Sequence, residues 1–188
     1  MPAVWTVLGP VEPESLGTTL MHEHLVPRPQ VPRPPAKPPF APRVGEADVA
    51  RELAWARQTY GLATVVDCTP RRSAEELASL ERIAREAGVS VVAATGCMKE
   101  QYYHPARGTL SSFWAYGLQS DEIAAVLVQE IEHGINGTRF RAGIIKVGTS
   151  KQRITRHEER VLRGAARRPR SSSRKAWTCG GWSSVTRT

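Results

Sequence analysis

Short apolar runs that alternate with helical segments are the feature that most constrains the fold of this 188-residue chain. Three runs, residues 63–69, 89–96 and 143–148, are rich in β-branched residues and closed by turn residues, which predicts buried strands. A shorter apolar segment, residues 18–21, predicts a strand ahead of them. Strands that alternate with helices and are buried on both faces predict a parallel α/β sheet.

Helical segments fill the intervals between these strands. Residues 46–60 and 120–133 carry apolar positions at helical spacing. Ser73 is the expected N-cap of another helix, because Glu76 follows three residues later and Gly88 supplies a stop. Thr155 opens a fourth helix. Four strand–helix units amount to half of a (β/α)₈ barrel, which typically needs about 250 residues, so this chain cannot close such a barrel by itself.

Two histidines, His22 and His24, follow the first apolar segment. Side chains two apart on a strand project to the same side, so both imidazoles can bind one metal ion from the end of a single strand. The same spacing also occurs at ordinary half-buried strand ends, where histidines hydrogen-bond to loop carbonyls.

Lys146 lies inside the last apolar run. Burial favours the neutral amine. A neutral amine can react with carbon dioxide, and the resulting carbamate is an anionic oxygen ligand that can bridge two divalent cations. The alternative is a strand-end lysine that extends its charge into solvent. Lys146, His22 and His24 all fall at the carboxyl ends of predicted strands, where barrel enzymes carry their active sites.

This combination resembles the phosphotriesterase family of the amidohydrolase superfamily. The resemblance extends over about residues 4–167, with the clearest matches at 7–13, 16–17, 19–25, 136–138 and 142–146. It implies an α/β fold of the (β/α)₈ TIM-barrel family, here truncated to about four β/α units.

The resemblance further implies a zinc-dependent hydrolase that cleaves ester, lactone or phosphotriester bonds of small molecules with a metal-bound hydroxide. Two divalent metal ions, expected to be zinc, would be bridged by a carboxylated lysine. His22, His24 and Lys146 match metal ligands of the family. Its remaining ligands, a histidine on each of strands five and six and an aspartate on strand eight, have no counterpart here. The site is therefore incomplete, and no catalytic residue is assigned.

By the same resemblance, residues 95–105 follow the third strand and line the pocket. Met98, Glu100 and Tyr103 are the expected substrate-binding residues. A surface loop with ordinary aromatic packing is an equal alternative. Three other histidines, His104, His133 and His157, are poor substitutes for the missing ligands: His133 is expected at a helix C-terminus and His157 at an exposed first turn. Full-length relatives are expected to be homodimers.

The positive charge is concentrated at the end of the chain. The formal net charge is +8, and residues 167–188 contribute six positive charges and no acid, which leaves +2 for residues 1–166. Residues 167–188 show no strand signal where the family has its fifth strand. One permitted back-translation of residues 171–188, read in the neighbouring frame, spells LVAEGLDLRRMVIGHAD, whose VIGH resembles the family's sixth strand.

We therefore expect two regions. Residues 1–166 form the N-terminal half of a metal-dependent hydrolase barrel, and residues 167–188 form a non-native, frame-shifted and disordered basic tail. The alternative function is a truncated, catalytically inactive half-barrel whose tail binds anions nonspecifically. Specific nucleic-acid binding is not expected.

The prolines, the cysteines and the lack of long apolar runs give three further expectations. Eight prolines between residues 27 and 42 predict an extended loop on the active-site side, with a ligand for proline-binding domains as the alternative. The three cysteines show no paired spacing, which predicts neither a disulfide framework nor a thiolate zinc site. Because no signal peptide or membrane-length apolar run occurs, no membrane association and a cytoplasmic location are expected.

Overall fold

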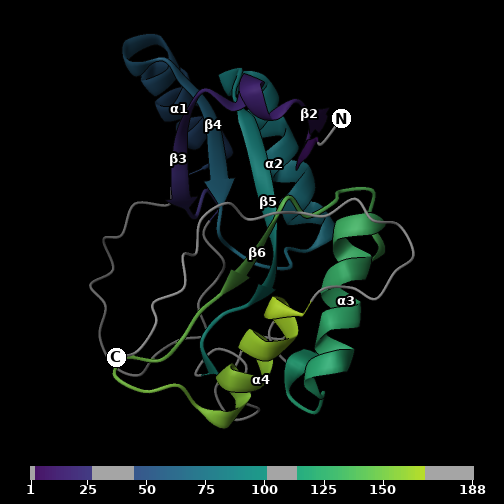
Figure 1. Cartoon of the computed structure of the whole chain (residues 1–188). Coiled ribbons are helices and arrows are strands. Elements are labelled where there is room, and N and C mark those ends of the chain that lie inside the picture. Colours follow the sequence, from purple (N-terminus) through teal and green to yellow (C-terminus); the bar gives the residue numbers. More distant parts are fainter. Residues whose placement is uncertain (1–2, 27–44, 101–113, 168–188) are drawn as a thin grey trace.

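A four-stranded parallel sheet forms the centre of the computed structural model, which describes residues 3–26, 45–100 and 114–167 (Figure 1). Its strands follow the order β3-β4-β5-β6, and neighbours in the sheet are also consecutive strands in the chain. They are β3 (Thr18–Glu23), β4 (Leu62–Asp67), β5 (Ser90–Cys97) and β6 (Ile144–Val147). A helix lies in each connection, which confirms the predicted α/β fold.

Four α-helices lie in the described ranges, and the predicted caps are present in two of them. They are α1 (Glu46–Tyr60), α2 (Ala74–Ala87), α3 (Ser120–Glu132) and α4 (Arg156–Ala166). Ser73 caps α2, since its hydroxyl accepts a hydrogen bond from the backbone N–H of Glu76 at 3.2 Å. Gly88 ends α2 with a φ of 69°, in the left-handed region that favours glycine. Thr155 caps α4 in the same way as Ser73, at 3.2 Å from the N–H of Glu158.

The helices pack in pairs, α1 against α2 and α3 against α4. One core cluster joins α1 and α2 to the two central strands through buried side chains such as Leu53, Leu77, Leu80, Val65 and Val91. A second cluster joins α3 and α4 to the end of β5, through Ile123, Leu127, Val161 and Cys97. Each pair of helices is thereby packed against the sheet.

A short antiparallel hairpin precedes the sheet and was not predicted. It comprises β1 (Val4–Thr6) and β2 (Gly9–Val11), and a 3-10 helix, η1 (Pro13–Leu16), leads on to β3. Val7, in the hairpin turn, donates a backbone hydrogen bond to the carbonyl of Val91 near the start of β5, at 2.9 Å. The hairpin therefore lies by the amino ends of the central strands. Three-residue strands are too short to show a period in the sequence.

The outer strands are less buried than expected. β4 and β5 are buried along nearly their whole length, whereas β3 is largely exposed and every residue of β6 is half-buried. Within the described ranges, no strand pairs with the outer edge of β3 or of β6. The expectation of burial on both faces is therefore wrong for these two strands, and Lys146 is half-buried rather than buried.

Several predicted features lie outside the described residues. These are the proline-rich loop at 27–42, the segment that holds Tyr103 and His104, and residues 168–188 of the basic tail. Helix α4 ends at Ala166, and the division into two regions stays a prediction. A second 3-10 helix, η4 (Ile135–Gly137), follows α3. None of the helices in the described ranges combines the length and apolar character needed to span a bilayer.

Candidate functional site

Three predicted ligands come together at the carboxyl ends of the two outer strands. His22 lies on β3, His24 follows directly after it, and Lys146 lies near the end of β6. The amine Nζ of Lys146 is 3.2 Å from Nε2 of His22. The rings of His22 and His24 are 5.5 Å apart between centroids and inclined at 62°. Both imidazoles are exposed and therefore open to a ligand from solvent.

The contact between Lys146 and His22 requires a strongly curled sheet. β3 and β6 are separated by two strands, so in a flat sheet they would lie roughly 14 Å apart, at about 4.8 Å per strand. A hydrogen-bond distance between their side chains is reached when the outer strands bend towards each other, as in half of a barrel. The four strands can be followed from β3 to β6 in Figure 1.

Gly96 sets the position of Lys146 from the neighbouring strand. The two residues are partners in the β5–β6 register. Gly96 has a φ of 117°, and a Cβ atom added there would lie 1.9 Å from the carbonyl oxygen of Lys146. Only glycine satisfies both the conformation and the close approach. The sequence marks Gly96 merely as the end of an apolar run, so its role could not be predicted.

A buried ion pair fixes the backbone beside the histidines. Asp67, the last residue of β4, and Arg72, ahead of α2, are 0% and 1% exposed. Arg72 donates to Asp67 through Nε at 3.1 Å and through Nη2 at 2.8 Å. Asp67 also accepts the backbone N–H of Leu25, the residue after His24, at 3.0 Å. The bidentate contact and the further hydrogen bonds offset the cost of removing both charges from water. The pair also ties the end of β3 to β4.

Thr69 connects this ion pair to His24. Its hydroxyl oxygen lies 3.0 Å from Nη2 of Arg72 and 2.6 Å from Nδ1 of His24. The pKa of His24 is lowered, chiefly by the partial burial of its ring and further by the nearby His22, Arg72 and Lys146, against the opposing effect of Asp67. A lowered pKa favours the neutral imidazole, which is the form that binds metal ions.

The two described cysteines are poorly suited to act as ligands or nucleophiles. Burial raises the pKa of Cys97 to about 12 and raises that of Cys68 against the opposing effect of Lys146. Both thiols are free, and at neutral pH both stay protonated. Cys179 lies outside the described residues.

The expected substrate-binding residues follow β5. Met98 and Glu100 are both half-buried, and their role stays a prediction. The N–H of Glu100 donates to the carboxylate of Glu158 at 3.0 Å, and its side chain lies 3.8 Å from Nε2 of His157. His157 is in the first turn of α4, as predicted, but it is half-buried, because its ring stacks on Tyr116 at 4.6 Å.

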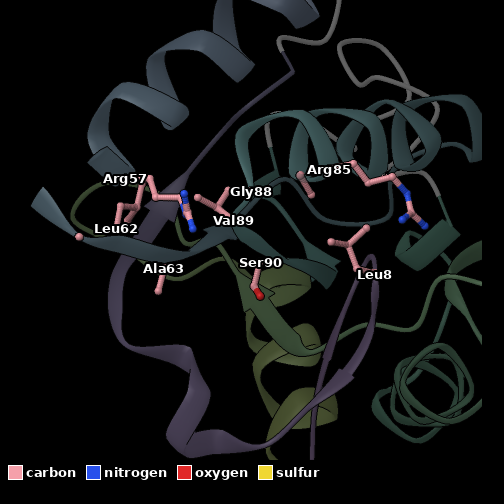
Figure 2. A pocket seen from close by; sticks show the side chains of 10 residues that line it. Leu8, Arg57, Leu62, Ala63, Arg85, Gly88, Val89 and Ser90 are labelled. Atoms are coloured by element: carbon pink, nitrogen blue, oxygen red, sulfur yellow. The ribbon is translucent and has the colours of Figure 1, made fainter. Parts of the chain in front are cut away.

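An open pocket of about 870 Å³ lies at the opposite end of the sheet (Figure 2). Its lining includes Leu8 of the hairpin turn and residues at the amino ends of β4 and β5, among them Leu62 and Ser90. Arg57 and Arg85 lie on opposite sides of the view, so their guanidinium groups do not converge. This pocket contains none of the candidate ligands.

The donor set fits a divalent cation in part. Two imidazoles and a lysine that can become a carbamate are suitable ligands for zinc-like ions. In the described part of the chain, however, no group of three or more histidine, cysteine, aspartate or glutamate residues could hold a metal ion. The described residues therefore do not complete a metal site by themselves.

Comparison with known proteins points to the same family as the sequence motifs. The profile of the Phosphotriesterase family matches residues 2–174. An N-acetyltaurine hydrolase from Tetraodon nigroviridis is 30% identical over 190 residues, covering 87% of this chain and 52% of that protein. An aryldialkylphosphatase from Saccharolobus solfataricus is 28% identical, covering 83% of this chain and 47% of that protein.

A lactonase from Listeria monocytogenes shares the fold, with a TM-score of 0.67 at 24% identity, over 87% of this chain and 52% of that structure. The chain thus spans about half the length of the proteins it matches. Its sheet corresponds to half of a TIM barrel, as the sequence predicted. From the profile match over most of its length, this chain belongs to the Phosphotriesterase family.

Proposed function

We propose that this chain supplies the first metal-binding strands of a hydrolase that uses water to cleave ester, lactone or phosphotriester bonds in small molecules. The observation that carries the proposal is the 3.2 Å distance between Lys146 Nζ and His22 Nε2, across three strand spacings of the sheet. Membership of a generally metal-dependent family supports it. So do the names of two relatives, an N-acetyltaurine hydrolase and an aryldialkylphosphatase.

Divalent cations, zinc in the first instance, would supply Lewis acidity toward a carbonyl or phosphoryl oxygen and would lower the pKa of water. His22 and His24 would hold them through ring nitrogens. Lys146 would act after carboxylation: its nitrogen attacks the carbon of carbon dioxide, a C–N bond forms, and one N–H proton leaves to water. The carbamate oxygens replace a positive charge beside His22 with a negative one, which favours cation binding.

A second candidate function is binding without turnover. It is favoured by the absence, within the described ranges, of any cluster of three or more histidine, cysteine, aspartate or glutamate residues able to hold a metal ion. On this view the chain holds a cation weakly through two imidazoles and catalyses nothing, since a cation with too few protein ligands is neither tightly held nor correctly oriented.

Titration of the 188-residue chain with Zn²⁺ in bicarbonate buffer, followed by calorimetry, tests the proposal. We expect weak binding that His22→Ala and Lys146→Ala each reduce about tenfold or more. His133→Ala is the matched control, because His133 lies at the end of α3 with a side chain 73% exposed. Equal binding in wild type and in His22→Ala would refute the assignment. Near two tightly held equivalents per chain would show that the described ligands are not a partial set.

A further inference from the structure

We infer that Thr69 is a positioning residue for His24. The Thr69 hydroxyl keeps the proton of the His24 imidazole on Nδ1 and thereby leaves Nε2 free to bind a cation. The inference rests on the proposed function, because it concerns the same metal-binding edge. The inference is based on the distance of 2.6 Å between the Thr69 hydroxyl oxygen and Nδ1 of His24. Thr69 is not among the residues that resemble metal ligands, and no pattern in the sequence singles it out.

The hydrogen-bond inventory restricts what Thr69 can do. A hydroxyl has one proton and two acceptor lone pairs, and a guanidinium can only donate. Arg72 Nη2, at 3.0 Å, therefore occupies one lone pair of Thr69. The contact with His24 then uses either the other lone pair, with Nδ1–H as the donor, or the hydroxyl proton, with Nδ1 as the acceptor.

Cation binding selects between these two arrangements. A neutral imidazole carries one N–H, so a cation on Nε2 requires the proton to be on Nδ1. Thr69 is then the acceptor of Nδ1–H, and its own proton turns away. Metal-binding histidines ordinarily have such a partner for their second nitrogen, and loss of the partner typically weakens metal binding by about 10–100-fold.

Thr69 is itself held in place by buried groups. Arg72 is anchored by Asp67, and Asp67 also accepts the N–H of Leu25, next to His24. One network thus fixes the backbone at His24 through Leu25 and the ring through Thr69. Three nitrogens of Arg72 donate to carboxylates, two to Asp67 and one to Glu76 at 3.3 Å, so loss of the Thr69 hydroxyl removes one acceptor of Nη2 but leaves these contacts in place. The hydroxyl of Thr69 can therefore be removed without breaking the buried ion pair.

The experiment measures the tautomer of His24 and the Zn²⁺ affinity of the full chain at about pH 8, where imidazoles are neutral. In ¹⁵N-labelled wild type with Zn²⁺, we expect His24 to be protonated on Nδ1 and coordinated through Nε2. Thr69→Val keeps the shape but removes the oxygen, and it should lose about 10–100-fold in affinity. Thr69→Ser keeps the hydroxyl and should restore affinity to within about threefold of wild type. Thr69→Ser should unfold at a urea concentration similar to that of wild type, and Thr69→Val at a lower one, because one N–H of Arg72 loses its acceptor.

The outcomes separate this inference from the function on which it rests. If wild type shows no Zn²⁺-dependent change at His22 or His24, the proposed function fails, and the role of Thr69 fails with it. If wild type binds Zn²⁺ but coordinates it through Nδ1 of His24, or if Thr69→Val binds as tightly as wild type, only the role of Thr69 is overturned. The tautomer in wild type decides the matter even if Thr69→Val does not fold.

Discussion

Buried ionisable side chains in this protein fall into two kinds. Asp67 and Glu158 are both 0% exposed, and each is surrounded by hydrogen-bond donors from different elements. Cys97 is buried at the end of β5, where its register partner is Val147 of β6, and burial raises its pKa to about 12. Hydrogen bonds lower the pKa of Glu158 and favour its charged form, whereas burial raises the pKa of Cys97 and favours its neutral form, so these two groups respond to pH in opposite directions.

Cys97 should make the folded chain sensitive to alkaline pH. Its pKa in the folded chain, about 12, is above the ordinary value of 9.0, so between these values the folded state binds more protons than the unfolded state. The contribution is fully present below about pH 9 and is lost as pH rises, by at most about 1.4 kcal/mol per pH unit. Urea unfolding of wild type and Cys97→Ala at pH 7 and pH 10 measures it. Parallel losses in the two proteins would contradict the prediction.

The candidate ligands were predictable as residues, but their supports were not. His22, His24 and Lys146 could be identified because their positions at strand ends and their chemistry are visible in the sequence. Gly96 and Thr69 act through a close backbone approach and a hydrogen bond between residues 45 positions apart. Such contacts depend on the curl of the sheet and on side-chain directions, which periodicity does not encode.

At the level of elements, the helix caps were the most predictable features and the outer strands the least. Ser73, Gly88 and Thr155 act as sequence signals indicated, because capping is a local interaction within a few residues. The exposure of β3 and β6 depends instead on which strands lie beside them, and neighbours in a sheet are not a local property. The β1–β2 hairpin was missed for lack of length.

Glu158 joins three elements and should matter more than its place on a surface helix suggests. It closes the capping box of α4 by accepting the N–H of Thr155 at 3.1 Å. It also accepts from the Ser150 hydroxyl at 2.6 Å and from the N–H of Glu100 at 3.0 Å. Burial alone would raise its pKa, but these hydrogen bonds outweigh burial and lower it.

Glu158→Gln should therefore reduce the free energy of unfolding by about 2 kcal/mol at pH 7, the usual cost of weakening hydrogen bonds to a buried charge. Because the pKa of Glu158 is lowered in the folded chain, its contribution is present above the ordinary value of 4.5 and is lost as pH falls. Hydrogen exchange at the Glu100 amide should accelerate in the variant.

Glu159→Gln is the matched control for this variant. Glu159 is the next residue, with a side chain 52% exposed, and its partner is Arg163 one turn along the helix. Exposed pairs of this spacing contribute about 0.5 kcal/mol or less. Equal destabilisation by the two variants would mean that Glu158 contributes only through the negative charge it places in the first turn of α4. It would also mean that Glu158 does not hold the segment after β5 in place.

At the scale of the whole molecule, the open sheet edges connect stability with function. The outer edges of β3 and β6 have no partner strand within the described ranges, and both strands carry candidate ligands near their ends. Unpaired edges invite pairing with another chain. The elements that would cover these edges in a closed barrel are also those that would bring further ligands toward His22 and Lys146.

Completing the barrel should therefore restore metal binding and activity together. In a chimera, residues 1–166 would be joined to the second half of the aryldialkylphosphatase relative, of which the present match covers 47%. We expect about two equivalents of Zn²⁺ and metal-dependent hydrolysis of an activated ester, lactone or phosphotriester. Lys146→Ala in the chimera should abolish this hydrolysis, and short carboxylic acids should partly restore it by replacing the carbamate oxygens, whereas His133→Ala should leave it unchanged.

The 188-residue chain should show no hydrolysis above that of free metal, because two strand ends place too few ligands around a cation. Metal-dependent turnover by the 188-residue chain, lost in His22→Ala, would instead show that four strands are enough to build the site.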